Sequence, residues 1–113
     1  MYVRKIIVKS SDGTILAQGN IGKGVVHVEG NYYFDKSLVN FDLIKMMGNG
    51  QQYTCPIKRG TCDYYNLVNS NGETVTEEIG WVYEKVNNEM FKLVEHKMAF
   101  YSYGRGLDIL TEE

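Results

Sequence analysis

Residues 60–75 read GTCDYYNLVNSNGETV, and this stretch decides the fold class. Residues 60–68 contain the aromatic and β-branched side chains that are typical of a strand. The run Asn69-Ser70-Asn71-Gly72 then predicts a tight turn, because asparagine and glycine tolerate the left-handed backbone that such turns require. Residues 73–75 return as the partner strand, so the stretch predicts a β-hairpin.

The same pattern of short strands and turn signals continues on both sides of this hairpin. Asp35 is expected to cap a short helix over 36–39, and residues 90–96 fit either a helical turn or a strand. We therefore expect a mainly β fold, a compact domain of many short antiparallel strands with one short helical segment. The further strands are predicted over 2–8, 14–18, 25–29, 81–83, 97–101 and 107–110.

Length and composition favour one compact domain spanning residues 1–113. Twelve basic and fourteen acidic side chains give a net charge of −2, which argues against nucleic acid as a partner. No apolar run approaches the ~20 residues that span a bilayer, and the N-terminus lacks the pattern of a signal peptide. Two cysteines do not make a disulfide framework, so we expect reduced thiols and a cytoplasmic location. The sequence leaves homo-oligomerisation open.

Metal and phosphate sites lack their usual sequence patterns. Cys55 and Cys62 do not have the spacing of a Cys-x-x-Cys zinc knuckle, so we expect no metal and no cofactor. There is no Walker-type run and no Asp-x-Asp pair for nucleotidyl or phosphoryl transfer. The glycine-rich stretch 19–24 lies between predicted strands, where a flexible loop is the simpler interpretation.

Side chains with reactive or charged groups are most concentrated at residues 54–60, TCPIKRG. Cys55 is the best candidate for a nucleophile, because the nearby Lys58 and Arg59 favour its thiolate. The alternative is a buried structural cysteine, which is the commoner role and the one we favour. Lys58 and Arg59, beside Gly60, are also candidates to bind an anion, and the alternative is an ordinary solvated loop.

Other residues suit the wall of a pocket. Glu29 ends an apolar strand, where its carboxylate has three candidate roles: to cap the turn, to pair with Lys58, or to act as a general acid or base. Nine tyrosines in a small domain leave many hydroxyls that need partners, so a pocket with several tyrosines is expected. The aromatic candidates for that pocket are Tyr33, Tyr64, Tyr65, Trp81 and Tyr83.

Four segments resemble, in order, the conserved blocks of the domain of unknown function family 427, and together they cover nearly the whole chain. Residues 28–34 (VEGNYYF) are similar to its Glu-Gly-x-x-Tyr-Phe-Pro block. Residues 54–65 (TCPIKRGTCDYY) are similar to its Thr-x-Cys-Pro-Trp-Lys-Gly-x-Ala-x-Tyr-Tyr block. Residues 80–83 (GWVY) and 98–101 (MAFY) resemble its Ala-Trp-x-Tyr and Val-Ala-Phe-Tyr blocks. Ile57 departs from the family's aromatic residue, and Arg59 has the position of an inserted residue.

The resemblance implies a bacterial or fungal protein and a complex β fold, the tent of methionine sulfoxide reductase B and Mss4-like proteins. It implies no defined biochemistry, and the nucleotidyltransferase-like label of the family has no support in these residues. Whether the domain is an enzyme stays open. We expect it to bind a small molecule or an anion in a pocket formed by Glu29, Tyr33, Cys55, Lys58, Tyr64 and Trp81. The alternatives are a non-catalytic structural or protein-interaction module and an enzyme that uses Cys55 as its nucleophile.

Overall fold

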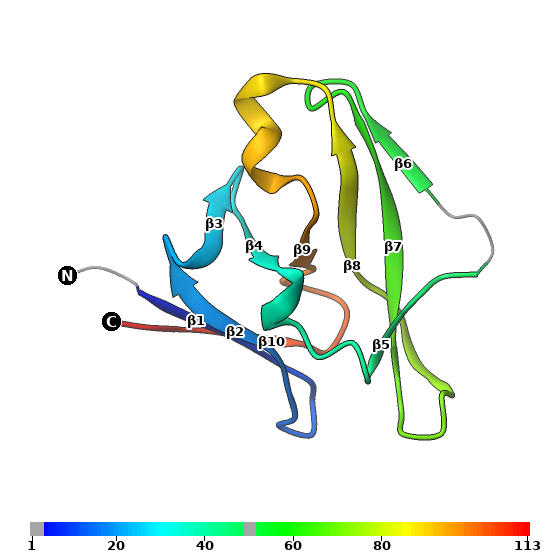
Figure 1. Cartoon of the computed structure of the whole chain (residues 1–113). Coiled ribbons are helices and arrows are strands. Elements are labelled where there is room, and N and C mark those ends of the chain that lie inside the picture. The colour runs from blue at the N-terminus through cyan, green and yellow to red at the C-terminus, as the bar shows by residue number, and fades with distance from the viewer. Residues whose placement is uncertain (1–3, 49–51) are drawn as a thin grey trace.

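The computed structural model describes residues 4–48 and 52–113 and shows a mainly β fold (Figure 1). This confirms the fold class predicted from the sequence; residues 2 and 3 of the first predicted strand lie outside the described residues. Two short 3₁₀ helices occur in the described part of the chain, η1 (Lys36–Leu38) and η2 (Glu89–Val94). The strands there are β1 (Lys5–Lys9), β2 (Ile15–Ile21), β3 (Gly24–Val28), β4 (Asn31–Asp35), β5 (Ile44–Met46), β6 (Gln52–Cys55), β7 (Gly60–Val68), β8 (Thr74–Val86), β9 (Lys97–Phe100) and β10 (Asp108–Glu112).

A single sheet joins these strands in the order β10-β1-β2-β3-β4-β9-β8-β7-β5, and β6 also pairs with β7. The short pairing of β2 with β3 is parallel, whereas neighbours such as β7 and β8 are antiparallel. Figure 1 shows β1, β2 and β10 on one side of the molecule and β6, β7 and β8 on the other. The strands β7 and β8 run at a steep angle to β1 and β2, which shows that the sheet is strongly twisted and bent. One of its faces is therefore concave.

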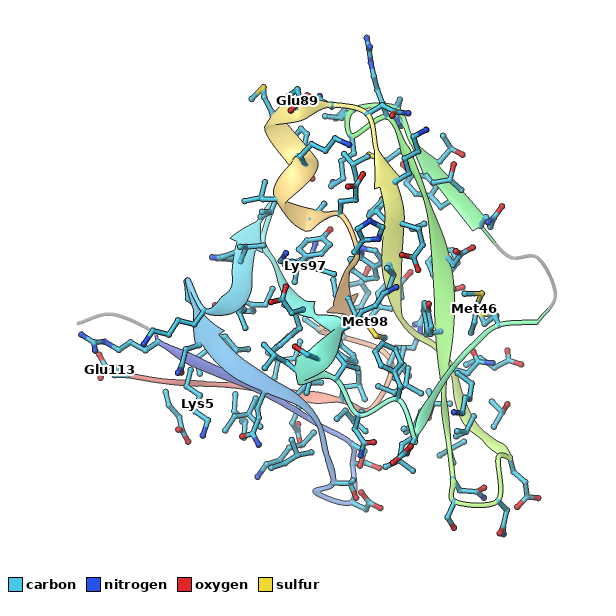
Figure 2. All side chains as sticks on the ribbon, in the orientation of Figure 1. Lys5, Met46, Glu89, Lys97, Met98 and Glu113 are labelled. Carbon is cyan, nitrogen blue, oxygen red and sulfur yellow. The ribbon has the colours of Figure 1, made fainter. Side chains whose placement is uncertain are left out.

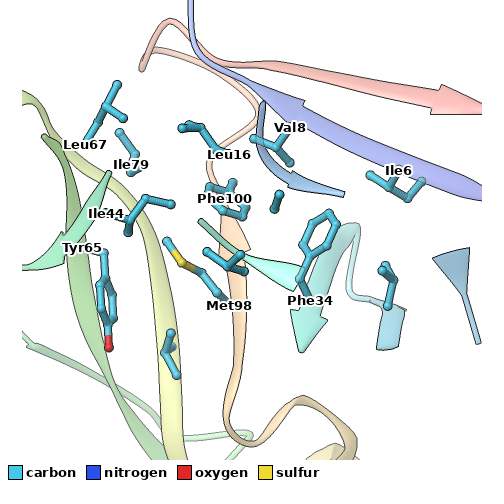
Figure 3. Packing of buried hydrophobic residues seen from close by; sticks show 14 residues of the cluster. Ile6, Val8, Leu16, Phe34, Ile44, Tyr65, Leu67, Ile79, Met98 and Phe100 are labelled. Carbon is cyan, nitrogen blue, oxygen red and sulfur yellow. The ribbon is translucent and has the colours of Figure 1, made fainter. Parts of the chain in front are cut away.

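The main core fills the inside of this bend. Phe34 of β4 and Phe100 of β9 meet edge to face, with ring centroids 5.8 Å apart (Figure 3). Figure 2 shows Met98 inside the molecule and Met46 at its periphery, where 52% of Met46 is exposed. The buried residues of the main core are Ile6, Val8, Leu16, Ala17, Val25, Phe34, Val39, Ile44, Tyr65, Leu67, Ile79, Val82, Met98 and Phe100.

The strand β8 is longer than the sequence indicates, because it includes residues 74–75 of one predicted strand and all of another, 81–83. The chain bends within β8 at Glu78, which has a left-handed φ of 52°, and the register with β7 shifts nearby. The backbone N–H of Glu78 donates to the Asn66 side chain at 2.8 Å. A bulge of this kind bends a strand without removing it from the sheet.

The predicted helix over 36–39 is present as η1, but its predicted cap is wrong. The Asp35 side chain makes no capping hydrogen bond. Asp35 instead faces Lys97 across the β4–β9 pairing, and their charged groups lie 3.0 Å apart. The ambiguous segment 90–96 overlaps η2, which begins at Glu89. Asn88 caps its first turn, because the Asn88 side chain accepts from the Met90 N–H at 3.1 Å.

Candidate functional site

A second cluster of side chains lies on the face of β4, β9, β8 and β7 that points away from the main core. Successive residues of a strand point to opposite faces. Phe34 and Tyr65 therefore enter the main core, while their neighbours Tyr33 and Tyr64 lie on the other face. The row of residues in register along this second face is Tyr33, Ala99, Trp81 and Tyr64.

The small side chain of Ala99 lets the larger rings on either side of it approach each other. The Trp81 indole N–H donates to the Tyr33 hydroxyl at 3.3 Å, and the two rings are nearly perpendicular at 82°. Trp81 also packs edge to face on Tyr101, with centroids 4.9 Å apart. The orientation of the indole is thus fixed by a ring on each side.

A second row of residues, next to the first, places both cysteines on this same face of the sheet. Cys62 of β7 is in register with Tyr53 on β6 and with Tyr83 on β8. Cys55 lies two residues from Tyr53 and so shares its face of β6. Both cysteines are buried free thiols, with Cys55 8% and Cys62 1% exposed.

The turn that joins β6 to β7, residues 56–59, is docked onto the start of η2. The Arg59 N–H donates to the Cys55 carbonyl at 2.9 Å and closes the turn. The Asn88 side chain donates to the Ile57 carbonyl at 2.7 Å, and the Asn88 N–H donates to the Lys58 carbonyl at 3.2 Å. These bonds direct the Lys58 side chain inward.

Arg59, with a φ of 54°, adopts the left-handed backbone that favours glycine. We predict that Arg59→Gly raises the free energy of unfolding by about 0.5–1 kcal/mol, because a left-handed conformation strains a residue with a Cβ atom. Urea unfolding measures this difference. A loss of stability would mean that the Arg59 side chain makes a compensating contact.

Among the residues that the structure describes, Lys58 is the one charged residue that is buried, with 6% of its surface exposed. Its ammonium forms an ion pair with Glu29, whose side chain is 42% exposed. The Nζ atom also lies 5.1 Å from the Phe91 ring centroid and 5.6 Å from that of Tyr83. Of the roles considered for Glu29, the structure therefore shows the pairing with Lys58.

Glu29 reaches Lys58 from the two-residue turn between β3 and β4. Val28 and Asn31 are in register, and the residues between them, Glu29 and Gly30, have φ values of 52° and 81°. Two positive φ values define the hairpin turn whose first position normally holds asparagine, aspartate or glycine. A glutamate in that position is strained, and it is held where its carboxylate meets the ammonium.

These elements enclose an open pocket of about 270 Å³. The residues predicted for a pocket that it brings together are Tyr33, Cys55, Lys58, Tyr64, Trp81 and Tyr83. Glu29 does not line it but contacts Lys58 from the side, and Tyr65 belongs to the main core. The remaining lining residues, which the sequence did not predict, are Asn31, Tyr53, Cys62 and Tyr101.

Burial raises the pKa of four tyrosine hydroxyls that line the pocket. It raises the pKa of Tyr33, and it raises that of Tyr64 to about 12. Burial also raises the pKa of Tyr83, and the Cys62 and Cys55 thiols beside it add to the effect. The pKa of Tyr101 is raised by burial and by its hydrogen bond to Glu78.

The ammonium of Lys58 also stays protonated at neutral pH. Burial acts to lower the pKa of Lys58, but the hydrogen bond with Glu29 and the nearby Tyr33 outweigh it and raise the pKa. Burial raises the pKa of the Cys62 thiol. The pocket therefore presents one cation and several neutral hydroxyl groups.

These shifts predict a loss of stability at alkaline pH. The pKa of Tyr64 is about 12 in the folded protein against 10.0 for the free side chain, so folding favours the protonated hydroxyl. This contribution is complete below pH 10.0 and is lost as the pH rises through about 12. Urea unfolding should show the decline over that range, and Tyr64→Phe should reduce it. A free energy of unfolding that stays constant up to pH 12 contradicts the assignment.

Residues 4–48 and 52–113 offer few side chains for a metal site or for histidine-based catalysis. They contain no group of three or more His, Cys, Asp or Glu side chains that could hold a metal ion. His27 stacks on Tyr32, with centroids 4.4 Å apart, and His96 lies 3.0 Å from Glu84; neither histidine lines the pocket. No helix in this part of the chain is long and apolar enough to span a membrane.

Fold and site together define a small mainly β domain with an aromatic pocket beside a buried lysine. The chain belongs to the domain of unknown function family DUF427, whose model matches residues 3–113. This confirms the resemblance seen in the four sequence blocks. A comparison with curated proteins found no match.

Proposed function

We propose that this domain binds a small molecule non-covalently in the pocket around Lys58 and Trp81. The observation that carries the proposal is a buried ammonium that lines an open pocket walled by aromatic rings. Aromatic walls with a few polar groups are typical of ligand sites, and a volume of about 270 Å³ suits a ligand smaller than most drugs. The Lys58 ammonium can only donate hydrogen bonds, so the ligand should carry an acceptor that meets it.

Binding is favoured over catalysis by the protonation states of the pocket. A general base works best with a pKa near the working pH. Lys58 is a cation, and the raised pKa values of Tyr64, Tyr83 and Cys62 leave these groups as neutral donors. The alternative in which Cys55 is a nucleophile would need a base beside it, and the two histidines lie elsewhere.

Nucleotidyl transfer also finds little support in the pocket. Such reactions hold Mg²⁺ with carboxylates close to the phosphates. Among the described residues, no Asp or Glu lines this pocket, and Glu29 is engaged with Lys58 at its side. We therefore do not extend the family's label to an activity. Because two free thiols line the pocket, we expect the protein to work in the reducing cytoplasm.

The experiment uses Trp81, the single tryptophan of the chain, as the reporter of pocket occupancy. Its fluorescence is followed while a panel of fragment-sized compounds, including benzoate, benzamide and inorganic phosphate, is added. At least one compound should change the emission with saturation in the wild type. Cys55→Ser should bind that compound equally well, because no covalent bond is formed. If no compound in a broad panel saturates the signal, the proposal is wrong; if binding requires Cys55, the enzyme alternative gains support.

A further inference from the structure

The ion pair between Lys58 and Glu29 joins groups with unequal access to water. Lys58 is 6% exposed, whereas the Glu29 side chain is 42% exposed. A buried ammonium needs a counter-ion, because removing it from water unpaired costs several kcal/mol. Glu29 needs Lys58 far less, since it can turn into solvent. The pair is therefore obligatory for the lysine and dispensable for the glutamate.

Lys58 faces the pocket on its other side. An ammonium has three protons to donate, and it lies among the pocket-lining residues, whereas Glu29 does not line the pocket. A positively charged ligand would face a like charge at this point. An anionic ligand would meet a cation and several hydroxyl donors, including those of Tyr33 and Tyr83.

The shape of the pocket favours a flat ligand. Trp81 stands at 82° to the Tyr33 ring and at 65° to the Tyr101 ring, and all three line the pocket. Rings prefer to meet other rings edge to face or offset. A planar acid could therefore place its ring against these walls and its carboxylate toward Lys58.

We propose, building on the proposed function, that the ligand is a small planar acid whose carboxylate replaces Glu29 as the counter-ion of Lys58. One carboxylate leaves the ammonium as another arrives, so the charge balance at Lys58 is conserved. Glu29 is released to solvent, to which 42% of its side chain is already exposed. The glutamate thus acts as a placeholder in the ligand-free protein.

The test compares three probes of one shape and different charge, namely benzoate, benzamide and benzylamine, by titration of Trp81 fluorescence. Wild type should bind benzoate more tightly than the other two. Glu29→Gln removes the competing carboxylate and should bind benzoate about fivefold more tightly, or ~1 kcal/mol, with benzamide unchanged. Glu112→Gln, an exposed site on β10 with the same change in charge, is the matched control and should behave as wild type.

A second variant guards against a folding defect at the turn. Glu29→Asn suits the left-handed backbone of this position and should reproduce the tighter binding of benzoate. If both variants fold and bind benzoate no more tightly than wild type, the ligand does not replace Glu29 as the counter-ion of Lys58. If benzamide or benzylamine binds as tightly as benzoate, the proposal that the ligand is an acid is wrong, although the pocket still binds a ligand. If none of the probes, nor the wider panel, affects Trp81 in any variant, the proposed function itself fails.

Discussion

Lys58→Met is expected to weaken benzoate binding by more than about tenfold. Its free energy of unfolding should either stay within ~1 kcal/mol of the wild-type value or rise above it. Methionine has a similar length and packs well against rings such as Tyr83 and Phe91. It removes a buried charge, and the carboxylate left behind on Glu29 can be hydrated because it is 42% exposed. A change that removes function without removing stability marks a group retained for binding.

Urea unfolding and Trp81 titration of the same preparation measure both quantities. Lys23→Met, at an exposed lysine in the turn between β2 and β3, removes the same charge and should change neither. A loss of several kcal/mol in Lys58→Met would contradict the expectation. It would favour the alternative in which Lys58, Glu29 and the docked turn 56–59 serve only the fold of a structural or interaction module.

Gly80→Ala is expected to lower the free energy of unfolding by about 3 kcal/mol. Gly80 lies in β8, in register with Phe100 of β9 and with Tyr65 of β7. A Cβ atom at this position would lie 2.3 Å from the Ala99 carbonyl oxygen, which belongs to the backbone and cannot turn aside. The two strands would have to separate beneath the row of residues that builds the pocket.

Gly48→Ala is the matched control, because a Cβ atom there meets nothing within 4 Å. It should unfold at nearly the wild-type urea concentration. If Gly80→Ala is equally stable, the close approach of β8 to β9 is not as the structure shows it. Ligand binding by Gly80→Ala should fall as well, since Ala99 and Trp81 are in register beside the altered residue.

Much of the fold could be predicted because its signals are local. The turn run 69–72 and the alternation of strand residues indicate a β domain without knowledge of the partners of each strand. The continuity of β8 could not be predicted, since the bulge at Glu78 depends on Asn66, a residue of the neighbouring strand. The role of Asp35 was mistaken for the same reason, because its partner Lys97 is distant in sequence.

The candidate pocket could be predicted only in part. Alternation along single strands could have placed Tyr53 with Cys55, and it could have separated Tyr65 from Tyr64. The register that brings Tyr33 beside Trp81 across Ala99 is a property of the assembled sheet and leaves no mark in the sequence. The strain at Glu29 is likewise visible only in the backbone.

The most direct test of small-molecule binding in this pocket is an NMR titration that follows the Trp81 indole N–H. This group donates to Tyr33 within the pocket, so its resonance reports a ligand there and not at a distant surface. We predict that benzoate shifts this resonance with saturation in the wild type and that Lys58→Met needs more than about tenfold more benzoate for the same shift. An indole resonance that stays fixed in the wild type, while benzoate shifts backbone amides only outside the pocket, would contradict the account.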